Sequence, residues 1–216
     1  IPRGGEGLIE AVMRESTIPV IKNYKGVGHV YVDKEADQEL AVQIVVNSKC
    51  QRPSVCNSAE GVIVHADIAK EFIPKVFNAL KDANCEVRAD EQFLQLAPEA
   101  TPLQESDRGE EFLDYIIAAT VVESLDEAID YINEYSSGHS ESIVSTNKES
   151  SRRFQMEIDS AAVYSNSSTR FTDGAEFGMG AEIGISTDKL HARGPMGLEE
   201  LTTYKYIING SGQLKG

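Results

Sequence analysis

The hydrophobic and polar positions of this chain repeat with two different periods. Short, β-branched apolar runs predict strands at 18–21, 29–32, 61–65, 115–122, 142–145, 160–166 and 202–209. Apolar residues spaced three and four apart predict helices at 6–15 and 36–49, after Asp67, after Ser124, and from about 148 to 158. Strands that alternate with helices are typical of an α/β fold with a largely parallel sheet.

Local signals refine two of these helices. Ser124 and Glu127 have the S-x-x-E spacing of a capping box, and Asp67 is an acidic residue suited to a helix N-cap. Pro74 falls inside the helical pattern that follows Asp67, where a proline removes a backbone donor and kinks the helix or shifts its start.

Composition and charge narrow the class of function. The 216 residues are 41% hydrophobic and 25% charged, as in a globular protein with one domain or slightly more. No apolar run is long enough to span a bilayer, and no secretory signal is evident at the start. The formal net charge of −15 repels nucleic acid and anionic membranes. An anionic substrate would therefore require a local cluster of Lys or Arg.

The chain begins without Met, and Ile1-Pro2 resembles the end of a strand. Because a domain rarely begins on the last residues of a strand, we expect a further N-terminal portion to precede it.

The three cysteines favour a reduced, cytoplasmic protein over a disulfide framework. Cys50 and Cys56 are separated by five residues, a spacing that fits neither a paired zinc site nor a C-x-x-C redox motif. No metal site is predicted. Packing is the ordinary role of a free cysteine, and it suits Cys50 and Cys85. Cys56 differs because it follows a proline-containing loop near Lys49 and Arg52, whose charges are expected to lower its pKa.

Five stretches together point to a family. They are NSKCQRPSVCN (47–57), GHVYVDKEAD (28–37), VVESLDEAIDYINEYSSGHSESIV (121–144), DSAAVYSNSSTRFTDGAEFGMGAEIGIS (159–186) and KLHARGPMGLEELTTYKY (189–206). In order and content they resemble the catalytic half of the γ-glutamyl phosphate reductases, a family of the aldehyde dehydrogenase superfamily. The resemblance implies an aldehyde dehydrogenase-like α/β catalytic domain with a mostly parallel sheet, plus a C-terminal oligomerisation strand.

The resemblance also implies a reaction and a nucleophile. The family reduces L-glutamate 5-phosphate with NADPH to L-glutamate 5-semialdehyde in proline biosynthesis, and its nucleophile matches Cys56. A thiolate that displaces phosphate forms a thioester, and the backbone N–H of Cys56 would stabilise the oxyanion. Residues 21–29 match a segment that carries a water-activating Glu in hydrolytic relatives, and they contain no Glu. A reductase has to keep water from its thioester, so this absence agrees with the interpretation.

Further residues receive roles by position. Arg3, Gly4 and Gly5 resemble the turn that meets the cofactor pyrophosphate, and the alternative is an ordinary glycine turn. Glu111 matches the glutamate that holds the nicotinamide ribose, and the alternative is a solvated surface residue.

Residues 165–174 resemble the family's substrate loop. Within it, substrate-binding roles are implied for Asn166, Ser168, Thr169 and Arg170. Arg170 would pair with a substrate carboxylate or phosphate, and the alternative is a surface salt bridge. The chain departs from the family at Cys50, where Thr is usual, and at Ser54, where Gly is usual.

The implied domain organisation has three parts. Residues 1–24 would be the last piece of an NADP-binding domain, residues 25–198 the catalytic domain, and residues 199–216 an oligomerisation segment. The resemblance also implies a cytoplasmic homo-oligomer that associates with glutamate 5-kinase. The alternatives are the reductase part of a bifunctional pyrroline-5-carboxylate synthase, an acylating aldehyde dehydrogenase that uses CoA, and a non-catalytic fragment.

Overall fold

The computed structural model describes residues 1–22, 25–189 and 191–216. Its main feature is a seven-stranded, all-parallel sheet with the order β4-β3-β5-β2-β1-β6-β7. The strands are β1 (Gly28–Val32), β2 (Ala59–His65), β3 (Glu86–Ala89), β4 (Thr101–Pro102), β5 (Ile116–Val122), β6 (Ser140–Val144) and β7 (Ala162–Ser165). The helices are α1 (Glu6–Glu15), α2 (Gln38–Cys50), α3 (Ala66–Asp82), α4 (Glu91–Leu96), α5 (Leu125–Tyr135) and α6 (Lys148–Glu157).

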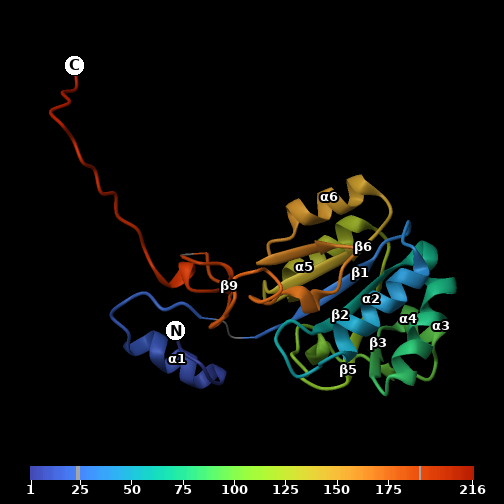
Figure 1. Ribbon diagram of the computed structural model, residues 1–216. Coiled ribbons are helices and arrows are strands. Elements are labelled where there is room, and N and C mark those ends of the chain that lie inside the picture. Colours follow the sequence, from blue (N-terminus) through green and yellow to red (C-terminus); the bar gives the residue numbers. More distant parts are fainter. Residues whose placement is uncertain (23–24, 190) are drawn as a thin grey trace.

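The central strands are buried on both faces, which explains their nearly continuous apolar sequences. Val30 and Val32 of β1 point into the core shared with α2, α3 and α4, whereas Tyr31 between them points into the core shared with α5 and α6. The helices therefore cover the two faces of the sheet in two groups, as Figure 1 shows.

Most helix starts follow their sequence signals. Ser124 caps α5 by accepting a hydrogen bond from the Glu127 N–H at 3.1 Å, which is the first half of the predicted capping box. The Glu127 carboxylate accepts from the N–H of Glu123, at 2.7 Å, rather than from that of Ser124. The α3 helix differs, because His65 rather than Asp67 is its N-cap residue. Pro74 lies on an exposed side of α3, and the helix continues through it from Ala66 to Asp82.

Two predicted strands are absent from the described structure. Residues 18–21 and 202–209 pair with no described strand. Both are β-branched or aromatic, but a strand also needs a neighbour for its backbone groups, and neither segment has one within the described part of this chain. Ile18 is largely exposed, and residues 202–216 extend away from the rest of the molecule (Figure 1).

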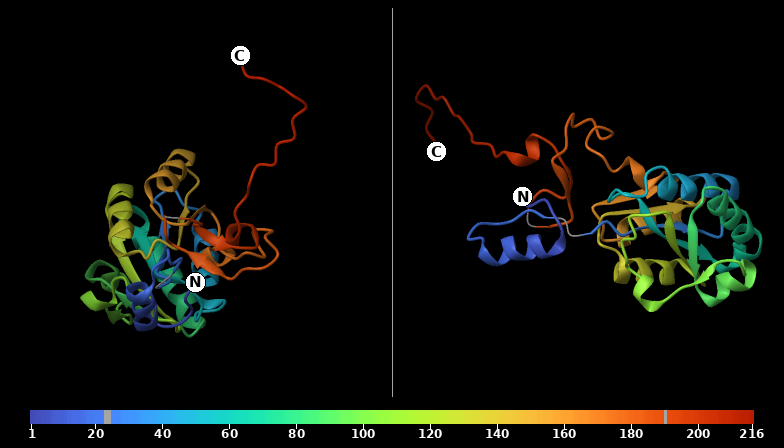
Figure 2. Two further views of the ribbon diagram at one scale, coloured as in Figure 1. Left: turned by 90° about the vertical axis from the view of Figure 1, so that its left-hand side faces the viewer. Right: turned by 90° about the horizontal axis from the view of Figure 1, so that it is seen from below.

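A smaller part of the molecule lies beside the sheet. It contains α1 and a short antiparallel hairpin formed by β8 (Gly184–Ser186) and β9 (Gly194–Met196), which Figure 2 shows on the same side of the sheet body. The predicted domain boundary falls at Tyr24, which is outside the described residues. None of the described helices is long and apolar enough to cross a membrane.

Candidate active site

Cys56 lies in the loop between α2 and β2, at the amino end of the parallel sheet. Open α/β sheets usually bind ligands at the carboxyl ends of their strands, so this location is distinctive. The base of the loop is closed by Ser58, whose hydroxyl donates to the carbonyls of Ser48 and Lys49 at 3.3 and 3.2 Å. The nucleophile loop, residues 51–58, is thus fixed to the end of α2.

A cleft of about 350 Å³ opens beside Cys56. It is formed by residues from four separate parts of the chain: Ile1, Pro2, Arg3, Gly4 and Ile9; Ile21 and Lys22; Ser54, Val55 and Cys56; and Gly184, Ile185 and Met196. A Cβ atom on Gly184 would lie 2.8 Å from the Arg3 guanidinium, so the glycine leaves room for that side chain. The structure therefore brings the predicted nucleophile and two predicted cofactor residues, Arg3 and Gly4, into one cleft.

The electrostatic setting of Cys56 differs from the sequence expectation. Burial is the main effect that raises the pKa of its thiol, and the charges of Glu182 and Glu111 raise it further. Its own backbone N–H and Arg3 act in the opposite direction. The expectation that Lys49 and Arg52 give Cys56 a lowered pKa was wrong.

Lys49 is not among the main influences on the pKa of Cys56, and its ammonium group is instead paired with Glu60. Its ammonium group is fully buried and lies 2.6 Å from a carboxylate oxygen of Glu60, in β2. Burial raises the pKa of Glu60 to about 7, while Lys49 opposes that shift. Because Lys49 precedes the nucleophile loop and Glu60 follows it, this ion pair joins the two ends of the loop.

The other cysteines form a separate pair. A hydrogen bond to Cys85 lowers the pKa of the half-buried Cys50 thiol, and the same contact raises the pKa of Cys85. Both pack on the core between the sheet and α2–α4. Among the described residues, no three His, Cys, Asp or Glu side chains are grouped so as to hold a metal ion.

The segment before β1 forms the wall behind Cys56. A Cβ atom on Gly26 would lie 2.1 Å from the Cys56 carbonyl oxygen, so only glycine fits there. The N–H of Gly26 donates to Glu111 at 2.8 Å. Glu111 therefore has a specific partner and an electrostatic effect on Cys56, and it is not simply a solvated surface residue.

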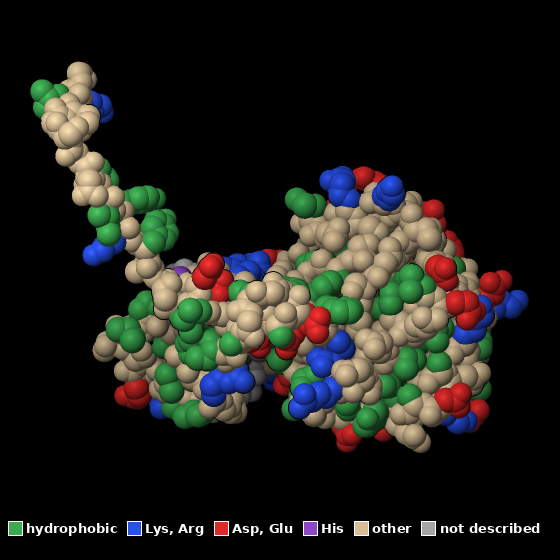
Figure 3. Space-filling view, viewed as in Figure 1, with side chains coloured by type: hydrophobic (Ala, Val, Ile, Leu, Met, Phe, Trp, Pro, Cys, Tyr) green, Lys and Arg blue, Asp and Glu red, His purple; other side chains and the backbone are tan. Residues whose placement is uncertain are grey.

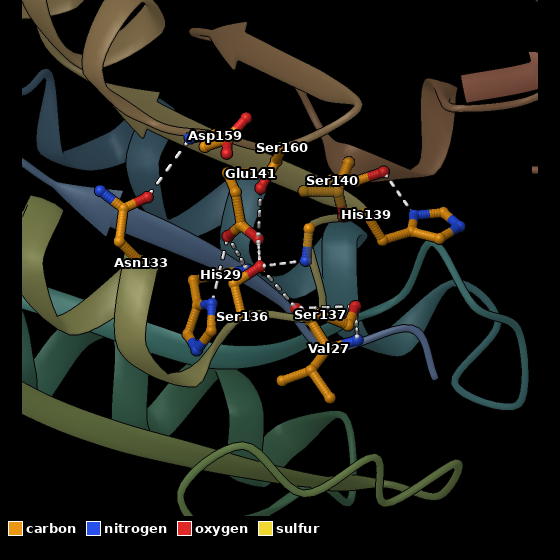
Figure 4. A network of polar contacts seen from close by, with 12 residues as sticks. Val27, His29, Asn133, Ser136, Ser137, His139, Ser140, Glu141, Asp159 and Ser160 are labelled. Atoms are coloured by element: carbon orange, nitrogen blue, oxygen red, sulfur yellow. Dashed lines mark hydrogen bonds and ion pairs between the residues drawn. The ribbon is translucent and has the colours of Figure 1, made fainter. Parts of the chain in front are cut away.

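A polar network holds the same segment from the other side (Figure 4). Ser137 accepts a hydrogen bond from the Val27 N–H at 2.8 Å. Glu141 accepts from the His29 N–H at 2.6 Å and from the Ser136 hydroxyl at 2.5 Å. These contacts join the amino ends of β1 and β6 and fix the wall of the site.

The predicted pyrophosphate turn stands at the start of α1. Gly5 is the N-cap and has no side chain to bond the amides of the first turn. Arg3 and Gly4 line the cleft directly before it. This arrangement has the free amides and positive charge that suit a phosphate group.

The predicted substrate loop folds back toward Cys56. Asn166 makes this possible, because it adopts a left-handed φ of 54° directly after β7. Its side-chain amide donates to the Ser145 carbonyl at 2.9 Å and accepts from the Ser145 N–H at 3.0 Å. The Asn166 side chain therefore stabilises a turn at the carboxyl end of the sheet, away from Cys56.

The next residues of this loop are anchored to the end of α2 and to the nucleophile loop. Ser168 accepts a hydrogen bond from Ser48 at 3.1 Å, and the Thr169 hydroxyl donates to the carbonyl of Asn57 at 2.8 Å. Both side chains are buried. Arg170 donates from Nε to the side-chain oxygen of Gln51 at 2.9 Å. It has no carboxylate partner among the described residues, so the surface salt-bridge alternative does not hold.

Asn57 and Glu182 are site residues that the sequence analysis missed. The Asn57 amide donates to the carbonyl of Thr172 at 2.8 Å, which ties the residue after Cys56 to the substrate loop. Glu182 acts on the Cys56 thiol from the segment before β8 and accepts from the Gly174 N–H at 2.8 Å. Asn57 is adjacent to Cys56 in the sequence, which was the only available signal. Glu182 has no local signal because it is distant along the chain.

A buried chain of hydrogen bonds ends at His139. Its Nδ1 lies 2.7 Å from the Ser140 hydroxyl, which donates to the Thr172 hydroxyl at 2.7 Å. With the Ser140 proton assigned to that bond, the contact at Nδ1 corresponds to a neutral ring that carries its hydrogen on Nδ1. Its Nε2 has no hydrogen-bond partner among the described residues. Burial lowers the pKa of His139 to about 4, so the ring is neutral near pH 7.

Comparison with known proteins gives a consistent result. An aldehyde dehydrogenase family model matches residues 108–207. γ-Glutamyl phosphate reductases from Enterococcus faecalis and Carboxydothermus hydrogenoformans are each 56% identical to this chain, over 215 and 216 residues. Each alignment covers 100% of this chain and 52% of the relative. This chain is therefore similar in sequence to γ-glutamyl phosphate reductases along its whole length. It spans about half the length of the curated relatives it matches.

Solved structures agree with this relationship. The crystal structure of a γ-glutamyl phosphate reductase from Thermotoga maritima superposes with a TM-score of 0.95 at 50% identity, covering 100% of this chain and 52% of that one. An acetylating aldehyde dehydrogenase from Geobacillus thermoglucosidasius gives a TM-score of 0.73 at 17% identity, covering 99% of this chain and 56% of that one. The second likeness shows the fold alone. The predicted resemblance and the aldehyde dehydrogenase-like α/β fold are confirmed.

Proposed function

We propose that this chain carries the nucleophile of an NADPH-dependent reduction of L-glutamate 5-phosphate to L-glutamate 5-semialdehyde, with release of phosphate, in L-proline biosynthesis. The observation that carries this proposal is the position of Cys56. It lies in a cleft together with Arg3 and Gly4, inside a chain similar in sequence along its whole length to γ-glutamyl phosphate reductases.

The chemistry begins at the Cys56 sulfur. The thiolate attacks the acyl carbon, the bond between that carbon and the phosphate oxygen breaks, and a thioester remains on Cys56. The developing oxyanion requires hydrogen-bond donors, and the backbone N–H of Cys56 is one such group at the site. Because the thiol has a raised pKa, losing its proton carries a free-energy cost.

The residues at the cleft fit a dinucleotide cofactor. Gly5 leaves the amides of the first turn of α1 without a side-chain cap, and Arg3 adds a positive charge beside it. Arg3, Gly4 and Gly5 would hold the pyrophosphate, and Glu111 would hold the nicotinamide ribose. When bound, NADPH supplies the hydride that converts the thioester to the aldehyde.

The residues of the predicted substrate loop would have different roles. Asn166 would set the turn that directs the loop toward Cys56. Ser168 would fix the loop to Ser48 at the end of α2, and Thr169 would fix it to the nucleophile loop. Arg170 is the member with polar groups left for a substrate, because only its Nε is bonded to another side chain in the described part of the chain.

We further propose roles for the three parts of the chain. Residues 1–24 would complete a cofactor domain, residues 25–198 would form the catalytic domain, and residues 199–216 would pair with another subunit. The exposed segment 202–209, which pairs with no described strand, supports an interface between copies. A cytoplasmic homo-oligomer and an association with glutamate 5-kinase remain predictions from the family.

A single-turnover experiment tests the function against two of the alternatives, a CoA-dependent enzyme and a non-catalytic chain. The chain is mixed with freshly generated L-glutamate 5-phosphate, and the peptide containing Cys56 is examined by mass spectrometry. We expect a glutamyl adduct on Cys56 with one equivalent of phosphate, none in Cys56→Ala, and an unchanged yield in Cys50→Ala. Acylation by an acyl-CoA alone would support the CoA-dependent alternative. No adduct from either donor would support a non-catalytic chain.

A further inference from the structure

The arginines of this chain differ in whether a carboxylate neutralises them. Six of the nine lie within 4.0 Å of an Asp or Glu oxygen: Arg14, Arg88, Arg108, Arg152, Arg153 and Arg193. Arg3, Arg52 and Arg170 have no such partner in residues 1–22, 25–189 and 191–216. The chain has 35 acidic residues, so unpaired arginines are not explained by a shortage of carboxylates.

These three arginines gather around Cys56. Arg3 lines the same cleft, and its charge acts to lower the pKa of the Cys56 thiol. Arg52 lies in the nucleophile loop itself, four residues before Cys56. Burial lowers the pKa of Arg170, the charge of Arg52 lowers it further, and the Cys56 thiolate acts in the opposite direction. The space-filling view shows Lys and Arg side chains on both sides of the notch between the α1 region and the sheet body (Figure 3).

The backbone and the Nε atom of Arg170 are fixed, while its terminal amino groups are not. Gln51 accepts the Nε–H at 2.9 Å, the Ser168 hydroxyl accepts the Arg170 N–H at 3.3 Å, and the Asn57 amide donates to the Arg170 carbonyl at 3.4 Å. Neither terminal amino group of Arg170 has a hydrogen-bond partner among the described residues. A guanidinium held at Nε with its outer edge free is arranged to bind two oxygens of one anion.

We propose that Arg52 and Arg170 form a clamp for the phosphoryl group of an acyl phosphate that reacts at Cys56. This inference rests on the proposed function and names the part of the site that receives the leaving group. When the sulfur bonds to the acyl carbon and the carbon–oxygen bond breaks, the electron pair leaves with the phosphate. The added negative charge then lies between two guanidinium groups.

The phosphoryl group fits this position better than the substrate carboxylate does. Its bridging oxygen is bonded to the carbon that Cys56 attacks, so phosphate must lie beside the sulfur. The α-carboxylate is separated from that carbon by the rest of the glutamyl chain. Two neighbouring guanidinium groups repel one another, and the effect of Arg52 on Arg170 has the sign of that repulsion. A phosphate between them removes it.

The acidic groups near Cys56 explain why more than one arginine is needed. Glu182 and Glu111 both place negative charge near the thiol. Each accepts a hydrogen bond from a backbone N–H at 2.8 Å, that of Gly174 for Glu182 and that of Gly26 for Glu111. Burial raises the pKa of Glu182, and Arg3 is one of the groups that oppose the rise. Arg52 and Arg170 are therefore the arginines left to attract an anion against the net charge of the chain.

Inorganic phosphate is the probe that tests the clamp. Cys56 is alkylated with iodoacetamide, a neutral reagent, and the rate is measured by peptide mass spectrometry at pH 8 with ionic strength held constant by chloride. We expect saturating phosphate to slow alkylation at least about threefold, because it adds negative charge beside the thiol. Arg170→Gln should weaken phosphate binding about tenfold or more, and Arg52→Gln to a smaller extent. Arg170→Lys should bind phosphate with an affinity between those of the wild type and Arg170→Gln, because it keeps the charge but loses the planar guanidinium group.

The controls separate the clamp from general charge and from folding. Arg152→Gln removes an arginine that is paired with Glu149 on α6, and it should leave protection unchanged. Gln51→Ala keeps both arginines and should weaken protection by releasing Arg170. Circular dichroism verifies that each variant is folded.

Three results would overturn the clamp. One is equal protection by chloride, and another is full protection by phosphate in both glutamine variants. The third is protection by glutarate but not phosphate, lost in Arg170→Gln, which would assign the arginines to a carboxylate. Phosphate binding does not depend on turnover. If phosphate protects Cys56 but no thioester forms, the clamp stands and the proposed function fails.

Discussion

At the scale of single residues, the pKa of Cys56 depends on burial and on opposing charges that lie far from it in the sequence. Burial and two nearby carboxylates hold its pKa above the ordinary value, whereas Arg3 and its own N–H partly compensate. Lys49, one of the two neighbouring cations that were expected to lower this pKa, is buried against Glu60. The reactivity of the thiol therefore depends on residues that are brought to it by the fold.

Glu182→Gln tests this balance. Removing one negative charge should lower the pKa of Cys56 and speed its alkylation at pH 8 by roughly two- to fivefold, because more of the thiol is ionised. The rate is followed by peptide mass spectrometry between pH 7 and 10. Glu176→Gln, an exposed position in the neighbouring turn, is the matched control and should leave the rate unchanged. A slower or unaltered rate in Glu182→Gln would contradict the assigned electrostatics.

His139 provides a pH-dependent test. Its pKa is about 4 in the folded chain and about 6.5 in an unfolded one, so the unfolded state binds the proton first as pH falls. The stability contribution of the neutral ring is complete above pH 6.5 and is lost as pH falls toward 4.

Between pH 7 and pH 5, we expect the wild-type free energy of unfolding to fall by about 2 kcal/mol more than that of His139→Gln. Urea denaturation at the two pH values measures the difference. His191→Gln changes an exposed histidine and should keep the wild-type pH dependence. Parallel curves for wild type and His139→Gln would show that His139 titrates normally.

At the scale of elements, the nucleophile loop is shaped by the entry to β1. Gly26 touches the backbone of Cys56 so closely that a side chain has no space. We expect Gly26→Ala to lower the free energy of unfolding by about 3 kcal/mol, since the backbone atoms that it meets cannot rotate away. Urea denaturation at pH 7 is the measurement.

Gly7→Ala in α1 is the matched control, because a Cβ there meets nothing within 4 Å. It should raise stability by about 0.5–1 kcal/mol through helix propensity. Similar effects of the two substitutions would mean that the nucleophile loop can move away from β1.

The elements also show what the sequence can and cannot predict. The helices α2, α3, α5 and α6 and the central strands have strong periodic patterns, so their existence and order were predictable. The short helix α4 was not predicted. The contacts that join distant elements to one another were not predictable. Asn57 bonds the Thr172 carbonyl, and these two residues are separated by 115 positions. The reversal at Asn166 depends on a left-handed backbone, which the sequence permits but does not require.

At the scale of the whole molecule, the net charge of the chain is negative, whereas the surroundings of the proposed nucleophile carry unpaired positive charges. A chain with a formal net charge of −15 repels an acyl phosphate at long range. Within its described residues, three arginines without carboxylate partners lie around the proposed nucleophile, so the attraction is local. The net charge predicted that an anionic substrate needs such a cluster. It did not predict which arginines form the cluster, because Arg170 reaches the nucleophile loop only through the fold.

The C-terminal segment carries apolar side chains that the described chain does not cover. Tyr204, Tyr206 and Ile208 alternate along an extended stretch and are 79%, 80% and 87% exposed. In a strand, alternate residues share one face, so these three would form an apolar strip. Such a strip, on a segment whose backbone groups have no neighbouring strand, is suited to pairing with another copy of the chain.

We therefore expect the chain to self-associate at micromolar concentration in sedimentation velocity experiments. The double substitution Tyr206→Ser and Ile208→Ser should weaken association about tenfold or more, because it removes two apolar side chains from the strip. Leu214→Ser changes a similarly exposed apolar residue outside residues 202–209, and it should leave association unchanged. A monomeric wild-type chain, or equal association of the double variant, would assign this segment no role in pairing.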